Sequence, residues 1–207
     1  THEKYDEANA LLRWRFGMAF LHVCAERGLQ EKNEILALPE PRDGNIALKT
    51  YVRICTTFIE IAQYEVALAL QDKVLAIRLK VLGPEHPDVG ATYNNMAGVY
   101  NAQGKNDQAL EAYEKALAIR LKVRGPKHPD VGATYNSMAG VYEVQGRSDQ
   151  ALDTYEKALA IRLQALGPEH PDVGATYYNV AGVYNAQGKN DQALKTYEKA
   201  LAIRLKV

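Results

Sequence analysis

The sequence predicts an all-α solenoid, in which antiparallel helix pairs stack one on the next. One stretch, residues 83–123, returns at 125–165 and again at 167–207, so the repeat period is about 42 residues. Within each copy, apolar residues recur at helical spacing, and Pro and Gly residues divide the copy into two helices. Because each unit of a stacked array packs only against its neighbours, we expect a repeated surface to carry the function.

Residues 1–40 are expected to form an atypical N-terminal helical pair. Apolar residues at helical spacing run from 5 to 27 and end at Gly28, which suits a helix C-terminus. A second, shorter helix is expected at 29–38. The pair does not match the later repeat, so it is either a cap over the apolar end of the array or the remnant of an adjoining domain.

The repeat array is expected to span residues 41–207, beginning with a degenerate copy at 41–82. The stretch 38–45 is a loop by its Pro and Gly content, and two helices are expected to follow, at 45–63 and 64–82. Four side chains in the first of these helices keep the register of the later repeats: Tyr51, Ile54, Cys55 and Phe58 fall where Tyr93, Met96, Ala97 and Tyr100 fall one period later.

Three near-identical repeats follow, at residues 83–124, 125–166 and 167–207. In the first of them, Pro87 suits a first helical turn, where its missing N–H costs nothing, and Asp88 suits the positive end of the helix dipole. Gly104 breaks this helix, and Asn106 is a candidate N-cap for the second. Each repeat is therefore expected to be two antiparallel helices joined by a short turn.

Eight positions of each regular repeat carry an aromatic, an aliphatic, a small residue, a Tyr, a turn Gly, an Ala, an aromatic and an Ala. In the first regular repeat they are Tyr93, Met96, Ala97, Tyr100, Gly104, Ala109, Tyr113 and Ala116. At these residues the chain resembles a tetratricopeptide repeat array. The long unit and the run ALAIRLKV followed by GPxHPDV are similar to the kinesin light chain subfamily. The resemblance implies a right-handed superhelix and a non-catalytic scaffold that binds proteins.

The sequence predicts no catalytic residues, no metal site and no cofactor. His86, His128 and His170 each lie in a His-Pro-Asp tripeptide, one whole repeat apart. They are therefore expected to form a ladder along one edge and not to converge on an ion. The same tripeptide ends every linker, so helix capping is its expected role. There is no phosphate-binding loop, nucleophile elbow or metal-spaced Cys/His set, so we expect no enzyme.

The first helix of each regular repeat contains Gly and Asn, and an internal Gly costs a helix about 1 kcal/mol relative to Ala. One interpretation is structural: the polar side chains bond to the neighbouring repeat and the glycines permit close packing. The other comes from the resemblance, which implies that first helices line a concave peptide-binding groove. The residues then expected to face a peptide are Asn94, Gly98, Asn101, Asn136, Gly140, Glu143, Tyr178, Gly182 and Asn185.

The groove hypothesis also limits the kind of peptide. Asn amides both donate and accept hydrogen bonds, so they suit a peptide main chain of any sequence. Glu143 favours a modest basic element. The regular first helices have no Lys or Arg, so a clamp for a C-terminal carboxylate is not expected. For Asn95 and its equivalents, Ser137 and Asn179, we expect a structural role, with hydrogen bonds to the backbone of the neighbouring repeat.

The composition excludes several classes of partner and location. Acidic and basic residues both number 25, so the chain lacks the basic footprint of a nucleic-acid-binding protein. No apolar run approaches the roughly 20 residues that span a bilayer, and the charged N-terminal stretch does not resemble a signal peptide. Cys24 and Cys55 lack metal-ligand spacing and are expected to be buried, reduced thiols. A cytoplasmic location follows as an expectation.

We therefore expect a scaffold or adaptor that binds a peptide segment of a partner protein in its concave groove, by analogy with kinesin light chains. The alternative is a structural spacer, or a segment that self-associates end to end, within a larger regulatory protein. The chain lacks an initiator Met, and a fragment of a longer protein is one expectation that follows.

Overall fold

The computed structural model describes residues 55, 58–60 and 62–206. The expected N-terminal pair at 1–40 and most of the first degenerate helix lie outside these residues. The chain divides into two compact units, Thr1–Pro84 and Glu85–Val207. We describe each unit by itself.

In the described part of the first unit, α4 spans Tyr64–Leu82, as expected from the sequence. Two residues of the preceding segment, Cys55 and Phe58, are buried, and Cys55 contacts α4. The Cys55 thiol donates to the carbonyl of Ala67 at 3.4 Å and accepts from the amide of Gln71 at 3.1 Å. Burial raises the pKa of this thiol to about 11, so Cys55 is an unreactive core residue.

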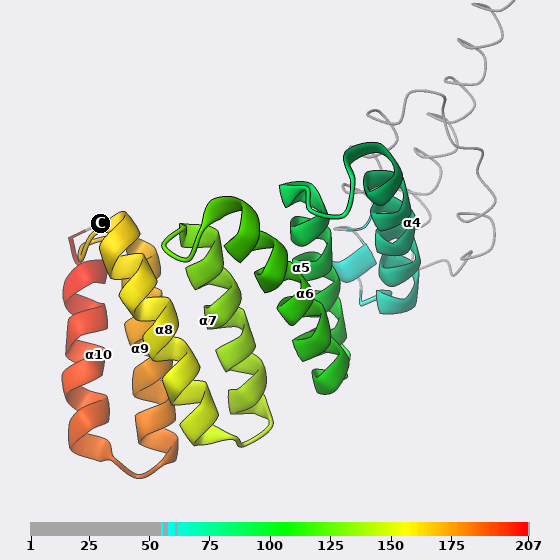
Figure 1. The fold of residues 1–207 in the computed structure, drawn as a ribbon. Coiled ribbons are helices and arrows are strands. Elements are labelled where there is room, and N and C mark those ends of the chain that lie inside the picture. The colour runs from blue at the N-terminus through cyan, green and yellow to red at the C-terminus, as the bar shows by residue number, and fades with distance from the viewer. Residues whose placement is uncertain (1–54, 56–57, 61, 207) are drawn as a thin grey trace, which may run out of the picture. The chain divides into compact units, whose positions relative to one another are not determined.

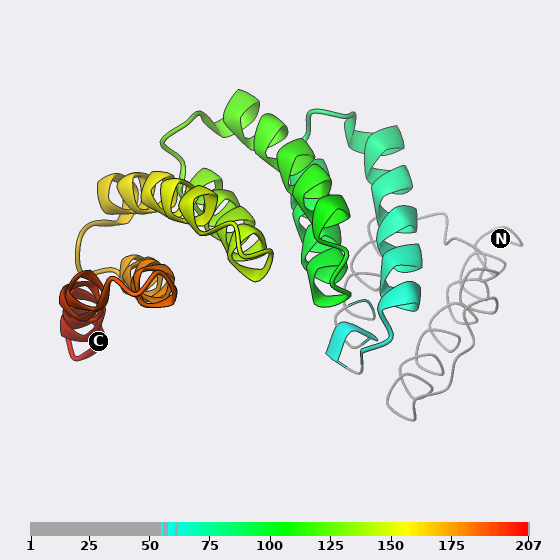
Figure 2. The same cartoon turned by 90° about the horizontal axis from the view of Figure 1, so that it is seen from below.

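The second unit contains three helix pairs: α5 (Pro87–Ala102) with α6 (Asn106–Arg124), α7 (Pro129–Val144) with α8 (Ser148–Leu166), and α9 (Pro171–Ala186) with α10 (Asn190–Arg204). The described residues contain no strand, which confirms the all-α solenoid. Each pair packs within itself, and α6 packs on α7 as α8 packs on α9. Both views show the last pair, α9 and α10, side by side (Figures 1 and 2).

The first helices of successive pairs also touch, because α5 contacts α7 and α7 contacts α9. These three helices therefore form one continuous face of the second unit. The core beneath them is built from small residues and tyrosines. In the first of its clusters, Ala97, Ala109 and Ala112 pack around Tyr113 and against Met138 of the next pair. Small side chains let the helices approach, and the Tyr rings fill the spaces that remain.

Each first helix begins at the His-Pro-Asp tripeptide. The imidazole Nδ1 of His86 accepts a hydrogen bond from the backbone N–H of Asp88 at 3.2 Å, and His128 and His170 repeat this cap at 3.1 Å. The Pro then occupies the first turn. Capping by the tripeptide is thus confirmed, with the His side chain as the acceptor.

The second helices begin differently from the expectation. Asn106 was expected to be an N-cap, but it is the first residue of α6, and the cap position belongs to Lys105, which makes no side-chain cap. The turn is closed by the backbone: Gly104 has φ of 72°, and the N–H of Lys105 bonds to the carbonyl of Tyr100 at 2.9 Å. The Gly in this left-handed conformation ends the first helix, and the second helix begins without a side-chain cap.

Candidate functional site

The first helices contain two kinds of glycine, which differ in what surrounds them. At Gly132, a methyl group would lie 3.2 Å from the side chain of Ile161, and Gly90 and Gly174 have the same surroundings. These glycines are required for the close approach of the paired second helix. At Gly98 an added methyl would meet nothing within 4 Å.

The other two glycines of the expected groove, Gly140 and Gly182, are also loosely surrounded. A methyl on Gly140 would lie 3.5 Å from the Tyr155 hydroxyl, and one on Gly182 would lie 3.6 Å from a carboxylate oxygen of Glu143. Both distances are ordinary van der Waals contacts. Close packing therefore does not explain Gly98, Gly140 or Gly182, and the structural interpretation given for them fails.

Glu143 lies at the junction of two repeats. It stands near the C-terminal end of α7, its side chain is exposed, and its Oε2 accepts a hydrogen bond from the Tyr155 hydroxyl at 2.9 Å. Its other oxygen faces Gly182 of the next first helix. The structure thus brings together four residues, Gly140, Glu143, Tyr155 and Gly182, which we call the Glu143 cluster.

The Glu143 cluster holds a carboxylate beside a buried phenol. Burial raises the pKa of Tyr155, and the neighbouring Glu143 charge and its hydrogen bond raise it further. The phenol therefore stays protonated and donates to Glu143. The carboxylate is fixed in place by this bond, yet exposed, and it keeps acceptor capacity for a cationic or N–H donor.

Asn94 and Asn136 have partners that the sequence analysis did not foresee. The Nη1 of Arg120 donates to Oδ1 of Asn94 at 3.0 Å, and Arg162 reaches Oδ1 of Asn136 at 3.4 Å. Both Asn side chains are half-buried. Their place is therefore beside the junction with the next repeat, and peptide binding by them stays a prediction.

The remaining expected residues are spread along the first helices. Tyr178, at the position of Asn94 and Asn136, is 60% exposed and stacks edge-on against Tyr197, with ring centroids 5.3 Å apart. Asn101 is half-buried and Asn185 is exposed, each in the last turn of its helix. Their role as peptide contacts also stays a prediction.

The three residues that we expected to have structural roles differ in their hydrogen bonds. Asn179 donates to Oδ1 of Asn136 at 3.4 Å, and Ser137 is hydrogen-bonded to Tyr113, so both join neighbouring repeats. Their partners are side chains, whereas backbone partners were expected. Asn95, in the first regular repeat, is exposed.

Sequence reasoning missed the arginine that joins successive repeats. Arg120 also donates to the carbonyl of Asp130 at 3.0 Å and to the hydroxyl of Thr134 at 2.5 Å, both on α7. Arg162 makes the same bonds to Asp172 and Thr176 at 3.0 and 2.7 Å. The signal was present, because this Arg and this Thr recur unchanged in every regular copy.

A second polar link accompanies the arginine. The amide of Gln145 donates to Asp107 at 3.2 Å, and that of Gln187 donates to Asp149 at 3.0 Å. Each bond runs from the end of one first helix to the start of the preceding second helix. The stack is thus held by buried apolar clusters and by polar bonds that repeat with the sequence.

Metal sites and membrane-spanning helices are both absent from the described residues. They contain no group of three or more His, Cys, Asp or Glu residues placed to hold a metal ion. Among the helices that the structure describes, none combines the length and apolar character needed to span a bilayer.

Comparisons with known proteins agree with this architecture. A family model described as tetratricopeptide repeat matches residues 47–122, 88–164 and 130–206. Among solved structures, BtubC (BKLC) from P. vanneervenii is similar, with a TM-score of 0.72, 22% identity and coverage of 99% of this chain and 76% of that one. No curated protein sequence matched.

A second solved structure is more similar in sequence. It is that of the nearly identical TPR-like repeats of a candidate kinesin light chain from P. anserina. Its TM-score is 0.67 at 27% identity, and the match covers 94% of this chain and 96% of that one. The subfamily resemblance noted from the long repeat is thereby confirmed.

Proposed function

The chain belongs to the tetratricopeptide repeat family, and from this membership we propose that it is a non-catalytic scaffold whose first helices bind a peptide segment of a partner protein. Members of this family act as protein-interaction scaffolds. The finer proposal concerns the surface and the ligand: the face formed by α5, α7 and α9, and an extended or helical peptide with a basic residue.

The observation that carries the proposal is the presence of glycines that packing does not require. Gly98, Gly140 and Gly182 each lie inside a helix, where Gly costs about 1 kcal/mol relative to Ala. A methyl group fits at all three positions without a clash. A bare surface along the first helices is what a closely approaching peptide backbone needs, and it accounts for a stability cost that the fold leaves unexplained.

The Glu143 cluster supports the basic element of the ligand. Its carboxylate is exposed and fixed by Tyr155, and the equivalent positions of the other two regular repeats hold Asn101 and Asn185. A Lys or Arg side chain of a bound peptide would therefore find an acidic partner in Glu143, and the amides at the equivalent positions of the other repeats suit the peptide main chain. By analogy with the P. anserina repeats, we propose a cargo or partner adaptor.

The first experiment selects ligands from a displayed library of unstructured peptides against the full chain. The test variant is Gly98→Leu, which places a bulky side chain in the open space at that position. The control is Ala118→Leu, which creates the same Leu side chain at an exposed position of the second helix in the same repeat. We expect Gly98→Leu to lose the selected peptides by at least about tenfold in Kd, and Ala118→Leu to keep them.

A second pair of variants tests the basic element. Glu143→Gln removes the charge while keeping an acceptor for Tyr155, and Glu156→Gln removes an exposed charge from α8 of the same repeat. Only the first should weaken peptides that contain Lys or Arg. If no peptide binds, or if Gly98→Leu binds like the wild type, the groove proposal is wrong. The spacer interpretation then takes its place.

A further inference from the structure

The face formed by α5, α7 and α9 offers a bound peptide more than one register. Residues 83–124, 125–166 and 167–207 repeat each other, so a peptide moved along by one repeat meets nearly the same side chains. The first helices share their open glycines and the aspartate of their first turn. These shared residues cannot fix the position of a peptide along the array. Any residue that does so must differ between repeats.

Glu143 is the charged residue of this face that differs. Apart from the first-turn aspartates, it is the single charged residue of α5, α7 and α9, and Asn101 and Asn185 hold the equivalent positions. Its side chain is exposed, and within the described part of the chain no Lys, Arg or His forms an ion pair with it. A cationic side chain of a ligand would therefore meet a carboxylate at one repeat and neutral amides at the other two.

Tyr155 holds this carboxylate in place. Its hydroxyl donates to Oε2 of Glu143 at 2.9 Å, and Tyr155 is 2% exposed, so the donor belongs to a core residue. The equivalent Tyr113 is also buried, but its hydroxyl is hydrogen-bonded to Ser137 of the next repeat. The same core tyrosine therefore has a different partner in the two repeats. A carboxylate that is already ordered loses less side-chain entropy when it pairs with a cation.

Gly140 and Gly182 flank the phenol and the carboxylate. A methyl group on Gly140 would lie 3.5 Å from the Tyr155 hydroxyl, and one on Gly182 would lie 3.6 Å from Oε1 of Glu143. Helix packing requires neither glycine, and neither position places a side chain over the pair. Because Tyr155 bonds to Oε2, the other carboxylate oxygen is the one left for a cation of the ligand.

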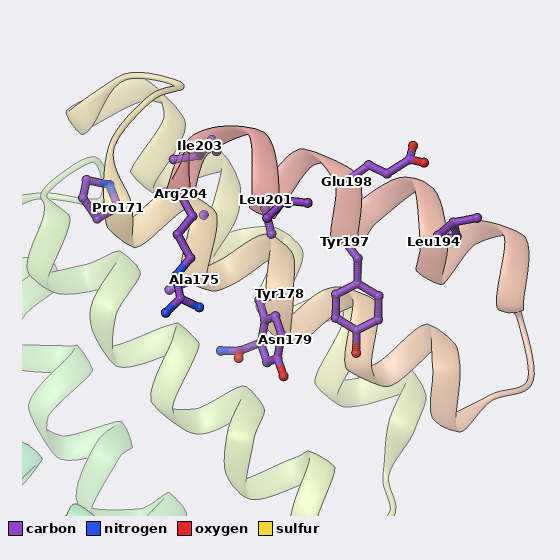
Figure 3. Close-up of a pocket in the computed structure, with 12 residues that line it drawn as sticks. Pro171, Ala175, Tyr178, Asn179, Leu194, Tyr197, Glu198, Leu201, Ile203 and Arg204 are labelled. Atoms are coloured by element: carbon purple, nitrogen blue, oxygen red, sulfur yellow. The ribbon is translucent and has the colours of Figure 1, made fainter. Parts of the chain in front are cut away.

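One other expected peptide contact differs between repeats. Tyr178 stands where Asn94 and Asn136 stand in the preceding first helices. Its ring packs edge-on against Tyr197, with centroids 5.3 Å apart, and the two rings lie next to each other in Figure 3. Tyr178 carries no formal charge. An ionic preference for one register can therefore come from Glu143 and not from this exchange.

We propose that Glu143, positioned by Tyr155, sets the register of the bound peptide by pairing with one Lys or Arg of the ligand. This inference rests on the proposed function, since it needs a peptide on the first helices. Because α7 contacts both α5 and α9, the basic residue must lie inside the bound segment, with main chain on either side of it to reach the amides of the other two helices.

Photo-crosslinking tests the register. The probe is a synthetic peptide of Gly, Ser and Ala with one central Arg and a benzoylphenylalanine beside it, added to the full chain at up to about millimolar concentration, because exposed ion pairs are weak. The first helices differ in sequence, so mass spectrometry of tryptic fragments identifies the repeat that is crosslinked. We expect crosslinks on α7. In the double variant Asn101→Glu/Glu143→Asn they should move to α5, whereas Tyr178→Asn should leave them on α7.

A neutral analogue of the probe tests the role of Tyr155. Citrulline in place of Arg keeps the shape and removes the charge, and a loss of folded chain affects both peptides equally. We expect the wild type to bind the Arg peptide about fivefold more tightly than the citrulline peptide. Tyr155→Phe should reduce this ratio to about twofold, because the carboxylate is no longer held. Tyr113→Phe, which removes the equivalent hydroxyl and leaves Glu143 bonded to Tyr155, should keep the ratio.

Crosslinks spread over all three first helices would overturn this proposal, and so would crosslinks that stay on α7 after the charge has moved to α5. An Arg preference that Tyr155→Phe leaves intact would overturn the positioning role. If the probe does not crosslink although peptides of the displayed library bind, the register proposal fails alone. If neither the probe nor any displayed peptide binds, the proposed function fails with it.

Discussion

At the scale of single residues, glycines in one helix have opposite reasons for being there. Gly132 and Gly140 both lie in α7 with helical backbone angles. The first faces Ile161 and the side chain of Arg162 at 3.2 and 3.3 Å from an added methyl, and the second faces only the Tyr155 hydroxyl at 3.5 Å. Replacing each glycine by Ala should therefore distinguish Gly132, which helix packing requires, from Gly140, which it does not require.

We predict that Gly140→Ala raises the free energy of unfolding by about 0.5–1 kcal/mol, because Ala gains helix propensity without a clash. Gly132→Ala gains the same propensity but forces Ile161 and Arg162 to move, so it should be less stable than Gly140→Ala by about 1 kcal/mol or more. Urea unfolding followed by circular dichroism measures both. Equal stability of the two variants would contradict the distinction.

The sequence could predict part of this site and not the rest. It singled out Gly140 because an internal glycine is costly to a helix, and Glu143 because the family resemblance implied that it faces the groove. The sequence could not show that Gly132 is needed for packing and Gly140 is not, because that depends on which of them faces Ile161 in the folded chain. It also missed Arg120, whose long side chain crosses to a residue of the next repeat that no local spacing links to it.

At the scale of the helix, the start of each first helix depends on an imidazole. His170 accepts from the N–H of Asp172, and Pro171 occupies the first turn. The sequence predicted a cap at this tripeptide because it ended every linker. It could not identify the acceptor, since Asp and His both have side chains that can serve, and only the φ and ψ angles at His170 place it in the cap position.

We predict that His170→Ala destabilises the chain by about 1 kcal/mol, because the N–H of Asp172 loses its partner. His170→Asn should restore most of the loss, since Asn is a favoured N-cap. The midpoint of urea unfolding gives both values. If His170→Asn is as unstable as His170→Ala, the cap is not what His170 contributes.

In the first and third regular repeats, an ion pair joins the linker to the end of the second helix. Lys122 pairs with Glu85, and Lys206 pairs with Glu169 at 2.6 Å. In the middle repeat both positions change together, to Lys127 and Gln164, so a repulsive pair of lysines is avoided. These exposed pairs add little stability, and the two positions are matched to each other within each repeat.

At the scale of the whole molecule, the second unit is a one-dimensional stack whose stability is shared between repeats and junctions. The repeat period predicted this architecture, since a unit that recurs unchanged must present the same face to each neighbour. The period did not show which polar groups join the units. Arg162 does so at the last junction, where it is 8% exposed and links α8 to Asp172 and Thr176 of α9.

We predict that Arg162→Met uncouples the last helix pair from the rest of the second unit. It removes the charged donor from the Thr176 hydroxyl and from the carbonyl of Asp172, which keeps only the bond from Thr176, and this loss costs about 1–3 kcal/mol at that junction. Because contacts in a solenoid are local, α9 and α10 should then open before the other pairs, with faster amide hydrogen exchange confined to them. The unfolding transition should broaden accordingly.

Arg204→Met is the matched control for this prediction, because it makes the same exchange at the same position of the repeat. Arg204 is exposed and has no following repeat to hold in the described chain, so its replacement should change neither exchange in α9 nor the unfolding midpoint appreciably. If the two variants behave alike, Arg162 acts through its own helix pair and not through the junction. If only Arg162→Met loosens the last pair, this arginine couples the repeats through its bonds to Asp172 and Thr176 of α9.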